Sequence, residues 1–577
     1  MTDFATLVRR RRWLPAALLV VLVVAAMGIG LGNSFSQDDI PIVVHNPIMA
    51  DAGLAVFSQP YWPKGYSPDL YRPFATLALS LQWHLGNGAA WPIHGVSILL
   101  YALLTLAVWR LARRILTEPA AWIAAALFAV HPVHVEAVAV GVNQSELMVA
   151  LLAVLIANSY VDGRQAGAFG VRRAVVMVLA LVVACFFKES AVVIPGLLVA
   201  AELTILRSGA RPAEFRILRP LYLACIMVVI GFMALRSAVL GNFAGTFTAE
   251  GLRGLDLAGR VTTMLGVVPT WLRLLVWPAH LQADYSPQEI VATVAFGPEQ
   301  WAGLAILLGT VTLAVLARRR APAVTFGTLW FALAIFPVSN IAIPTGIVLA
   351  ERTLLLPSVG FALVIGGLLE LALVQAHTVR PLLRPLAAGA MVLLLGLGVV
   401  RSAIRTKVWN SNDYLWERTE EDAPLSYRAH HARAQFFFQN GNFTEGEVHA
   451  FRAIQLYPAA FQMRAELGDR YRQFGLCHPA VASYRIALRL APGRSDIRAS
   501  LIACELWLGQ YAQARGQARL GRAWEADADV FAAFLALADS AERANAPPQT
   551  VRATLPARFG FGAGVRVGSP PKRSAQR

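Results

Sequence analysis

The chain has 577 residues, of which 56% are hydrophobic and only 15% are charged. Soluble globular chains have about 25% charged residues, so this composition excludes an ordinary soluble protein and indicates an integral membrane protein. The formal net charge of +16 is distributed as short basic clusters between apolar runs. That distribution is typical of a topology signal and excludes a continuous nucleic-acid-binding face.

Apolar runs that are long enough to cross a bilayer, roughly 17–25 residues each, fill the first 404 residues of the chain. The first run follows four arginines and lacks a small-residue cleavage site, so we expect it to be an anchor. A weaker apolar segment at 261–278 carries Arg273 and two prolines, and we expect it to lie in the interface or to re-enter the membrane. We therefore expect eleven spans, near 13–32, 91–110, 119–137, 144–161, 171–187, 190–206, 218–237, 299–317, 321–341, 351–374 and 385–403.

Basic clusters occur in alternate connecting segments between these spans. They lie at 9–12, 110–114, 162–173, 207–219, 318–320 and 380–384. The positive-inside rule places such clusters in the cytoplasm, so the N-terminus is expected to be cytoplasmic. Because the number of spans is odd, everything after residue 404 is expected to lie outside the cytoplasm.

From about residue 424 the apolar runs stop and a repeat with a period of 34 residues begins. Three sets of residues share this period: Gly441, Gly475 and Gly509; Pro424, Pro458 and Pro492; and Gly446, Ala480 and Ala514. This spacing, with small residues at the helix crossing and proline at the repeat end, is typical of tetratricopeptide repeats. Such repeats stack helix pairs into a superhelix whose groove holds extended peptide.

The sequence thus predicts three parts. A polytopic membrane domain is expected over 1–404, and a repeat domain of about three repeats plus a closing helix over 405–545. The remaining residues, 546–577, are rich in Gly, Pro, Ser and Arg and are expected to be disordered. The four cysteines have no metal-ligand spacing, and no disulfide framework is expected.

Ionisable groups near membrane spans are costly, which makes them candidates for a functional site. Two adjacent carboxylates, Asp38 and Asp39, directly follow the first span. A carboxylate in such a loop is often merely solvated, but four further segments place polar residues on the same predicted outer face. These are His131, His134 and Glu136; Lys188 and Glu189; Asp284 and Tyr285; and Glu351 and Arg352.

The motifs "DDIPIVVHNP", "YRPFATLALSLQWHLG", "LFAVHPVHVEAV", "FKESAVVIP", "ADYSP" and "ERTLLLPSVGF" precede the repeats in this order. This arrangement resembles the transmembrane-and-tetratricopeptide O-mannosyltransferase family, within the wider group of polytopic GT-C glycosyltransferases. The resemblance implies an all-α GT-C membrane domain followed by a tetratricopeptide superhelix. It also implies a bacterial inner-membrane glycosyltransferase that uses a polyprenyl-phosphate sugar as donor on the outer side. Asp38 and Asp39 match the family's acidic pair, and the second motif adds Arg72 to the candidates.

The sequence departs from the family pattern at two places. A Gly-Arg pair would be typical before "SEL", and Asn143-Gln144 stands there instead. A His-Asn-His pattern in the second span appears as His94, Ser97 and Tyr101. The identity of the sugar therefore stays open, and it could differ from mannose.

Transfer of a sugar from a lipid phosphate to a protein hydroxyl needs a base and a counter-charge for the leaving phosphate. One of Asp38 and Asp39 is the predicted base, and the other is an orienting or metal-coordinating group. The guanidinium of Arg352 matches phosphate geometry. Roles in donor or acceptor binding are predicted for Arg72, His131, His134, Glu136, Lys188, Glu189, Asp284, Tyr285, Glu351 and Arg352.

No metal ligand is assigned and no cofactor is firmly implied. A divalent cation stays open because His131 and His134 are able to hold one, although a substrate-binding or structural role is favoured for them. The expected partners are a polyprenyl-phosphate sugar, an acceptor protein in the repeat groove, and membrane lipids, but no nucleic acid. The alternative is a non-enzymatic, membrane-anchored tetratricopeptide scaffold, which has no use for the outer-face acids. A transporter is disfavoured because matched halves and mid-span charges are not seen.

Overall fold

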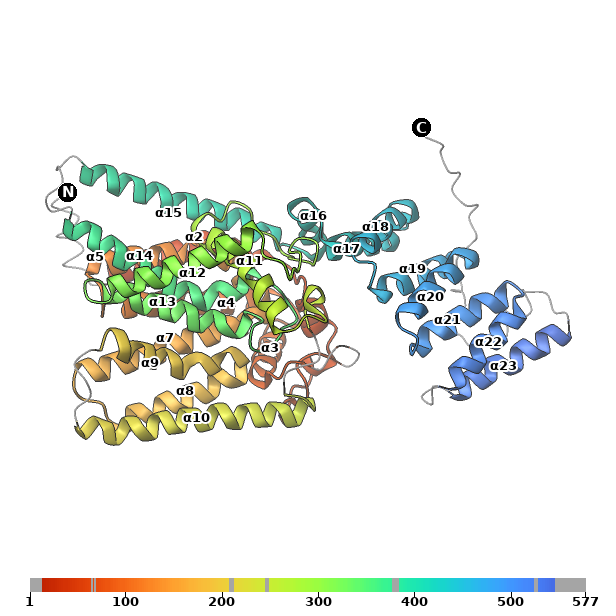
Figure 1. Ribbon diagram of the computed structural model, residues 1–577, viewed down its shortest axis with the longest axis horizontal. Helices are drawn as coiled ribbons and strands as arrows, with labels where there is room; N and C mark the ends of the chain where they lie inside the picture. The colour runs from red at the N-terminus through yellow and green to blue at the C-terminus, as the bar shows by residue number, and fades with distance from the viewer. Residues whose placement is uncertain are drawn as a thin grey trace. The chain divides into compact units, whose positions relative to one another are not determined.

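The computed structural model describes residues 13–63, 66, 69–206, 212–243, 248–375, 383–523 and 528–544. The chain divides into two compact units, Met1–Ala423 and Pro424–Arg577 (Figure 1). Within the described residues all regular structure is helical, which confirms the all-α prediction. The basic cluster at 9–12 and the expected tail at 546–577 lie outside the described residues.

The first unit is a bundle of helices (Figure 1). Long segments that contain short helical turns connect α2 to α3 and α13 to α14. Its helices are α2 (Leu14–Met27), α3 (Pro73–Leu85), α4 (Trp91–Ala112), α5 (Glu118–Ala129), α6 (Val135–Ala139), α7 (Gln144–Gln165), α8 (Val171–Phe187), α9 (Ile194–Thr204), α10 (Pro212–Leu240), α11 (Leu257–Val276), α12 (Pro298–Ala317), α13 (Pro322–Ile335), α14 (Leu355–Gln375), α15 (Leu383–Val408) and α16 (Asn412–Asp422). Proline occupies one of the first two positions of α2, α3, α4, α5, α9, α12 and α13. Proline suits these positions because the N–H group that it lacks has no helical partner there.

Seven helical segments of the described residues are long and apolar enough to cross a membrane. They are Leu14–Gly32, Trp91–Ala112, Gly141–Gln165, Arg216–Leu240, Pro298–Ala317, Glu351–Ala372 and Pro385–Val408. The number of candidate spans rises to eight if a bent pair of helices is counted as one broken span. This pair consists of Glu118–Ala129 and Pro132–Ala139, with a bend of 49° between them. The chain is therefore a multi-pass membrane protein.

The expected count of eleven spans is higher than this length criterion supports for the described residues. The expected spans at 171–187, 190–206 and 321–341 correspond to α8, α9 and α13, which have 17, 11 and 14 residues. Helix α9 is short because a polar turn at Lys188 and Glu189 precedes it. Helix α11 is not among the candidate spans, in agreement with the interfacial or re-entrant interpretation of 261–278.

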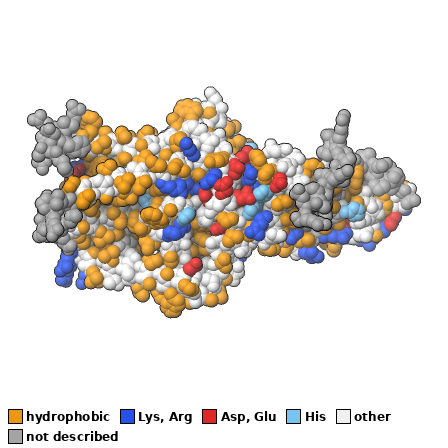
Figure 2. Space-filling view, turned by 90° about the horizontal axis from the view of Figure 1, so that it is seen from above, with side chains coloured by type: hydrophobic (Ala, Val, Ile, Leu, Met, Phe, Trp, Pro, Cys, Tyr) orange, Lys and Arg blue, Asp and Glu red, His pale blue; other side chains and the backbone are white. Residues whose placement is uncertain are grey.

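Many hydrophobic side chains are exposed on the face of the first unit that Figure 2 shows. Leu308 and Val311 of α12 and Leu393 and Leu397 of α15 are between 58% and 63% exposed. Inside the bundle, α13 and α14 approach closely at Gly327 and Gly360, where a side chain on either glycine collides with the carbonyl of the other. Small residues at such crossings let two backbones pack tightly without a hydrophobic driving force from water.

The second unit consists of consecutive helix pairs. They are α17 (Tyr427–Gln439) with α18 (Phe443–Leu456), α19 (Phe461–Gln473) with α20 (Cys477–Leu490), and α21 (Ser495–Trp507) with α22 (Tyr511–Arg522), followed by α23 (Ala528–Arg543). Equivalent helices begin 34 residues apart, as the sequence repeat predicts. Gly441, Gly475 and Gly509 follow the first helix of each pair with φ of 77°, 75° and 72°, a left-handed conformation that favours glycine.

The boundary between the units falls at 423/424, later than the expected domain start at residue 405. Helix α16 belongs to the first unit because its last residue is held there. The Asp422 carboxylate lies 3.5 Å from Arg405 Nη1, and its carbonyl oxygen accepts a hydrogen bond of 3.1 Å from Gln282 Nε2.

Candidate functional site

The two adjacent acids after the first span occupy different environments. Asp39 is fully buried, and its carboxylate accepts hydrogen bonds from the backbone N–H groups of Gly141 (2.9 Å) and Val142 (2.8 Å). Asp38 is only half-buried. A side chain at position 141 would meet Ile93 Cγ2 and come within 3.4 Å of both Asp39 oxygens, so glycine is needed for this contact. Asp39 therefore fixes the loop, while Asp38 stays accessible.

Burial raises the pKa of Asp39 to about 7, although the hydrogen bonds from Gly141 and Val142 act in the opposite direction. The neighbouring charge of Asp38 adds to the increase. Burial removes the water that stabilises the charged carboxylate. Hydrogen bonds from two N–H groups compensate for only part of that loss when no cation is beside it.

Arg72 stands at the N-cap of α3 because Pro73 follows it, and a residue before proline is kept out of the helical conformation. Its guanidinium forms a two-armed contact with Glu189, with Nε–Oε2 at 3.1 Å and Nη2–Oε1 at 2.6 Å. It also lies over the ring of Tyr61, 5.5 Å from the centroid. Burial alone raises the pKa of Glu189, but the charge and hydrogen bonds of Arg72 outweigh burial and hold that pKa at about 2.

Lys188 and Arg352, the other two cations among the predicted site residues, are also paired with glutamates. Lys188 contacts Glu146, in the first turn of α7. Arg352, in η10 (Glu351–Leu354), contacts Glu136 of α6 through its guanidinium, and its backbone N–H donates to Glu136 Oε2 at 2.8 Å. Burial has the largest effect on the pKa of Lys188 and lowers it, whereas the negative charge of Glu146 acts to raise it.

Tyr61 and Glu146 connect these pairs into one group. Tyr61 lies within electrostatic range of Asp38, Asp39, Arg72 and Glu189. Glu146 lies within such range of Arg72 and Arg352, and Arg352 within range of Asp38. The structure thus brings seven predicted residues together: Asp38, Asp39, Arg72, Glu136, Lys188, Glu189 and Arg352.

Glu351 and Tyr285 belong to a second buried group around Arg405 of α15. Glu351 Oε2 lies 3.4 Å from Arg405 Nη2, and Glu351 Oε1 accepts hydrogen bonds from Gln282 N (2.6 Å) and Tyr285 Oη (3.2 Å). Asp284 contacts the hydroxyl of Ser286. Glu351 and Arg352 are adjacent in sequence, but they pair with different partners.

The two histidines of the third motif are held by protein groups. His134 is fully buried, with Nε2 at 2.7 Å from Ser358 Oγ and Nδ1 at 2.7 Å from Tyr101 Oη. His131 Nε2 lies 2.9 Å from the Leu275 carbonyl oxygen, and its Nδ1 accepts a hydrogen bond of 3.3 Å from Val133 N. These contacts favour a structural role for both side chains over the predicted substrate-binding role.

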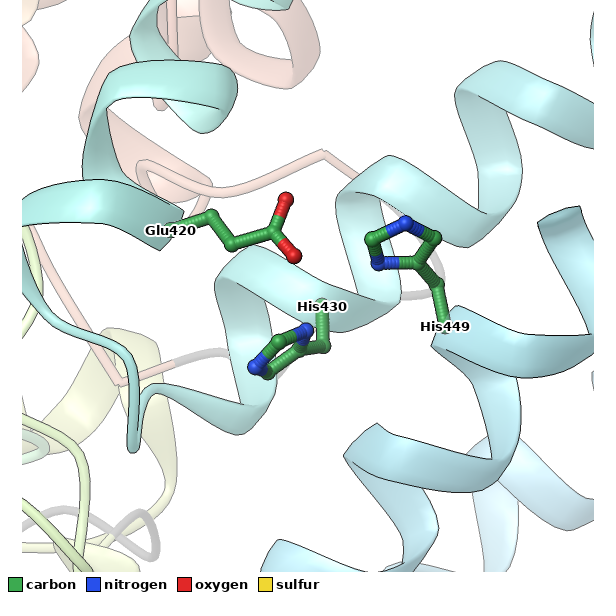
Figure 3. Close-up of side chains that lie close together, drawn as sticks. All are labelled: Glu420, His430 and His449. Atoms are coloured by element: carbon green, nitrogen blue, oxygen red, sulfur yellow. The ribbon is translucent and has the colours of Figure 1, made fainter.

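Two further histidines lie in the second unit. The ring centroids of His430 on α17 and His449 on α18 are 5.8 Å apart, and Figure 3 shows both imidazoles together with the side chain of Glu420. His430 Nε2 lies 3.1 Å from the Pro424 carbonyl oxygen, and His449 stacks on Phe437 at 5.1 Å. Glu420 belongs to α16 of the first unit, and we assign no metal site to these residues.

Sequence reasoning missed three residues of these groups: Tyr61, Glu146 and Arg405. Glu146 stands in the first turn of a helix, where an acid is common for reasons of helix stability. Tyr61 gives no signal in a single sequence. Arg405 does give one, because it is an ionisable residue within a candidate span, Pro385–Val408.

The chain is similar in sequence to known mannosyltransferases. The family model described as dolichyl-phosphate-mannose-protein mannosyltransferase matches residues 68–240. The chain is 26% identical over 442 residues to the protein O-mannosyl-transferase F38B6.6 of Caenorhabditis elegans, a match that covers 74% of this chain and 61% of that protein. It is 25% identical over 510 residues to the human protein O-mannosyl-transferase TMTC1, covering 79% of this chain and 57% of that protein.

Among solved structures, an oligosaccharyltransferase of Archaeoglobus fulgidus with a tethered acceptor peptide matches with a TM-score of 0.40 and 13% identity. That match covers 78% of this chain and 60% of the other. The chain thus spans about three fifths of the length of the relatives named here. The chain is similar to these protein O-mannosyl-transferases over most of its own length.

Proposed function

We propose that this protein is a membrane glycosyltransferase that moves a mannose-like sugar from a polyprenyl-phosphate carrier to a hydroxyl group of a protein. The observation that carries the proposal is the half-buried carboxylate of Asp38 within electrostatic range of the Arg352 guanidinium. The names of the similar proteins, which are protein O-mannosyl-transferases, support the sugar and the protein acceptor.

Arg352 is the proposed partner of the donor phosphate. Its Nη1 contacts Glu136, whereas Nε and Nη2 have no hydrogen bond to any other described residue. By contrast, Arg72 already donates hydrogen bonds from Nε and Nη2 to Glu189. An arginine with one edge of its guanidinium still available can bind a phosphate through two parallel N–H groups. Arg72 and Lys188 then shape the site electrostatically and hold Glu189 and Glu146.

Asp38 is the proposed base. The oxygen of the acceptor hydroxyl attacks the anomeric carbon of the sugar, and its proton goes to the Asp38 carboxylate. The bond between the anomeric carbon and the phosphate oxygen breaks, and its electron pair leaves with the phosphate, whose added charge Arg352 offsets. Asp39 is not the proposed base because it is fully buried and both of its oxygens face backbone N–H groups, so the acceptor hydroxyl does not reach it. Its proposed role is to orient the loop that carries Asp38.

The proposed reaction takes place on the outer side of a bacterial inner membrane, with a cytoplasmic N-terminus and the repeats outside the cytoplasm. The repeats recruit the acceptor protein through their groove, and the spans contact membrane lipids. Nucleic acid has no part in this function. Because His131 and His134 direct their ring nitrogens to protein groups, we propose that Arg352, and not a metal held by these histidines, offsets the phosphate charge.

The test is a transfer assay with the full-length protein in lipid nanodiscs, polyprenyl-phosphate mannose and a Ser/Thr-rich peptide. Because a general base contributes roughly 10²–10⁴ in rate, Asp38→Asn should lose about that much transfer. Asp51→Asn is the matched control, since Asp51 is an exposed acid in the same connecting segment. Transfer by the wild type should persist in EDTA. Full transfer by Asp38→Asn would overturn the proposal and favour the membrane-anchored scaffold.

A further inference from the structure

The Tyr61 hydroxyl is a buried polar group that the mechanism above does not use. Tyr61 is 4% exposed, and its hydroxyl oxygen has no hydrogen-bond partner among the described residues. The residue itself is well fixed, because its backbone N–H donates to the Leu70 carbonyl oxygen at 2.7 Å and Arg72 lies over its ring. Buried hydroxyls are normally hydrogen-bonded, so an unpaired one in a rigid position indicates a group that meets a ligand.

Two more hydroxyls near the charged residues share this property. Ser36 Oγ and Ser190 Oγ are buried without a hydrogen-bond partner among the described residues. Ser36 precedes the two acids of the first loop, and Ser190 follows Glu189. The segments that supply the charged residues therefore also supply hydroxyl groups without protein partners, which is the composition of a polar binding site.

The charges around Tyr61 decide which kind of ligand its hydroxyl can meet. Asp38, Asp39 and Glu189 all act on Tyr61 electrostatically, and Arg72, the cation over its ring, is already paired with Glu189. Because Arg72 offsets the charge of Glu189, the two adjacent acids Asp38 and Asp39 remain to repel a phosphate, whereas a neutral hydroxyl group of a sugar meets no such repulsion. Burial raises the pKa of Tyr61 above its ordinary value, so its O–H stays protonated and can donate.

We propose that the Tyr61 hydroxyl binds a neutral hydroxyl group of the donor sugar. This inference rests on the proposed function and adds a sugar contact to it, within electrostatic range of the base Asp38 and separate from the phosphate contact at Arg352. Tyr61 is then a specificity-determining residue, because a hydrogen bond to one sugar hydroxyl distinguishes sugars that differ at that carbon.

The test compares the binding of two lipids to the full-length protein in nanodiscs: polyprenyl-phosphate mannose, and polyprenyl phosphate without a sugar. One neutral hydrogen bond contributes about 0.5–1.5 kcal/mol, so Tyr61→Phe should bind the sugar-bearing lipid about two- to tenfold more weakly. Its affinity for the sugar-free lipid should be unchanged. Arg352→Lys should weaken the binding of both lipids, because both carry the phosphate.

The same variants separate this inference from a structural role. Tyr61→Phe removes no hydrogen bond within the described chain, so its unfolding temperature should not fall. Tyr71→Phe is the matched control: the Tyr71 hydroxyl donates to the Phe57 carbonyl oxygen at 2.9 Å, so this variant should unfold at a lower temperature and bind both lipids normally. Equal effects of Tyr61→Phe on both lipids, no effect on either, or a lower unfolding temperature would each overturn the sugar contact alone. A wild type that binds neither lipid would overturn the proposed function, and this inference with it.

Discussion

The two adjacent acids should respond to the same substitution in opposite ways. Asp39→Asn replaces a carboxylate that accepts two backbone N–H groups, those of Gly141 and Val142, at 2.9 and 2.8 Å. The asparagine side chain offers one acceptor oxygen, and its NH₂ group then faces the second N–H. One buried donor left without an acceptor costs about 1–3 kcal/mol. Asp39→Asn should therefore be destabilised by about that amount, whereas Asp38→Asn should keep the stability of the wild type.

The pH dependence of stability gives a second measure of the same residue. The pKa of Asp39 is raised from 3.8 to about 7 in the folded chain. Between these values the folded state binds a proton that the unfolded state has released, so the contribution of Asp39 to stability falls as the pH rises through this range. Asparagine does not titrate, and Asp39→Asn should lack this slope.

The assay is thermal unfolding of the full-length protein in detergent, followed by tryptophan fluorescence between pH 4 and pH 8. Transfer activity is measured in parallel and divided by the amount of folded protein. Asp51→Asn serves again as the control, because Asp51 is exposed. The reasoning is refuted if Asp39→Asn keeps the stability of the wild type and loses transfer, since Asp39 would then act in the chemistry and not in the loop.

Two further predictions concern topology and the repeats. A reporter that is active only in the cytoplasm, fused after residue 420, should be silent, because the basic clusters and the odd number of expected spans place this region outside; an active reporter would mean that 261–278 crosses the bilayer. Truncation at residue 424, where the second unit begins, should abolish modification of the native protein target and leave binding of polyprenyl-phosphate mannose intact; loss of lipid binding would show that the membrane domain needs the repeats to fold.

Several features of this protein follow from local sequence patterns, and the structure agrees with them. The apolar composition indicates a membrane protein, and long apolar helices are present. The 34-residue period places the starts of the paired helices at 427, 461 and 495 and at 443, 477 and 511. The sequence predicts these features because they depend on residues that are close together in the chain. Such local features are hydrophobic periodicity, glycine in left-handed turns and small residues at helix crossings. The length of each helix is harder to predict from the sequence, because a polar turn at Lys188 and Glu189 precedes α9 and a turn at Phe336–Val338 follows α13.

The roles within the candidate site depend on contacts between distant segments. Asp38 and Asp39 are equivalent in the sequence, and only the approach of Gly141 and Val142 makes Asp39 the buried one. Likewise, the sequence places Glu351 beside Arg352, but the structure pairs Glu351 with Arg405 and Arg352 with Glu136. Ion pairing and burial depend on distances between side chains that lie tens to hundreds of residues apart in the chain. Composition and periodicity contain no information on those distances, so the fold alone decides which acid is available as a base and which cation is available to a phosphate.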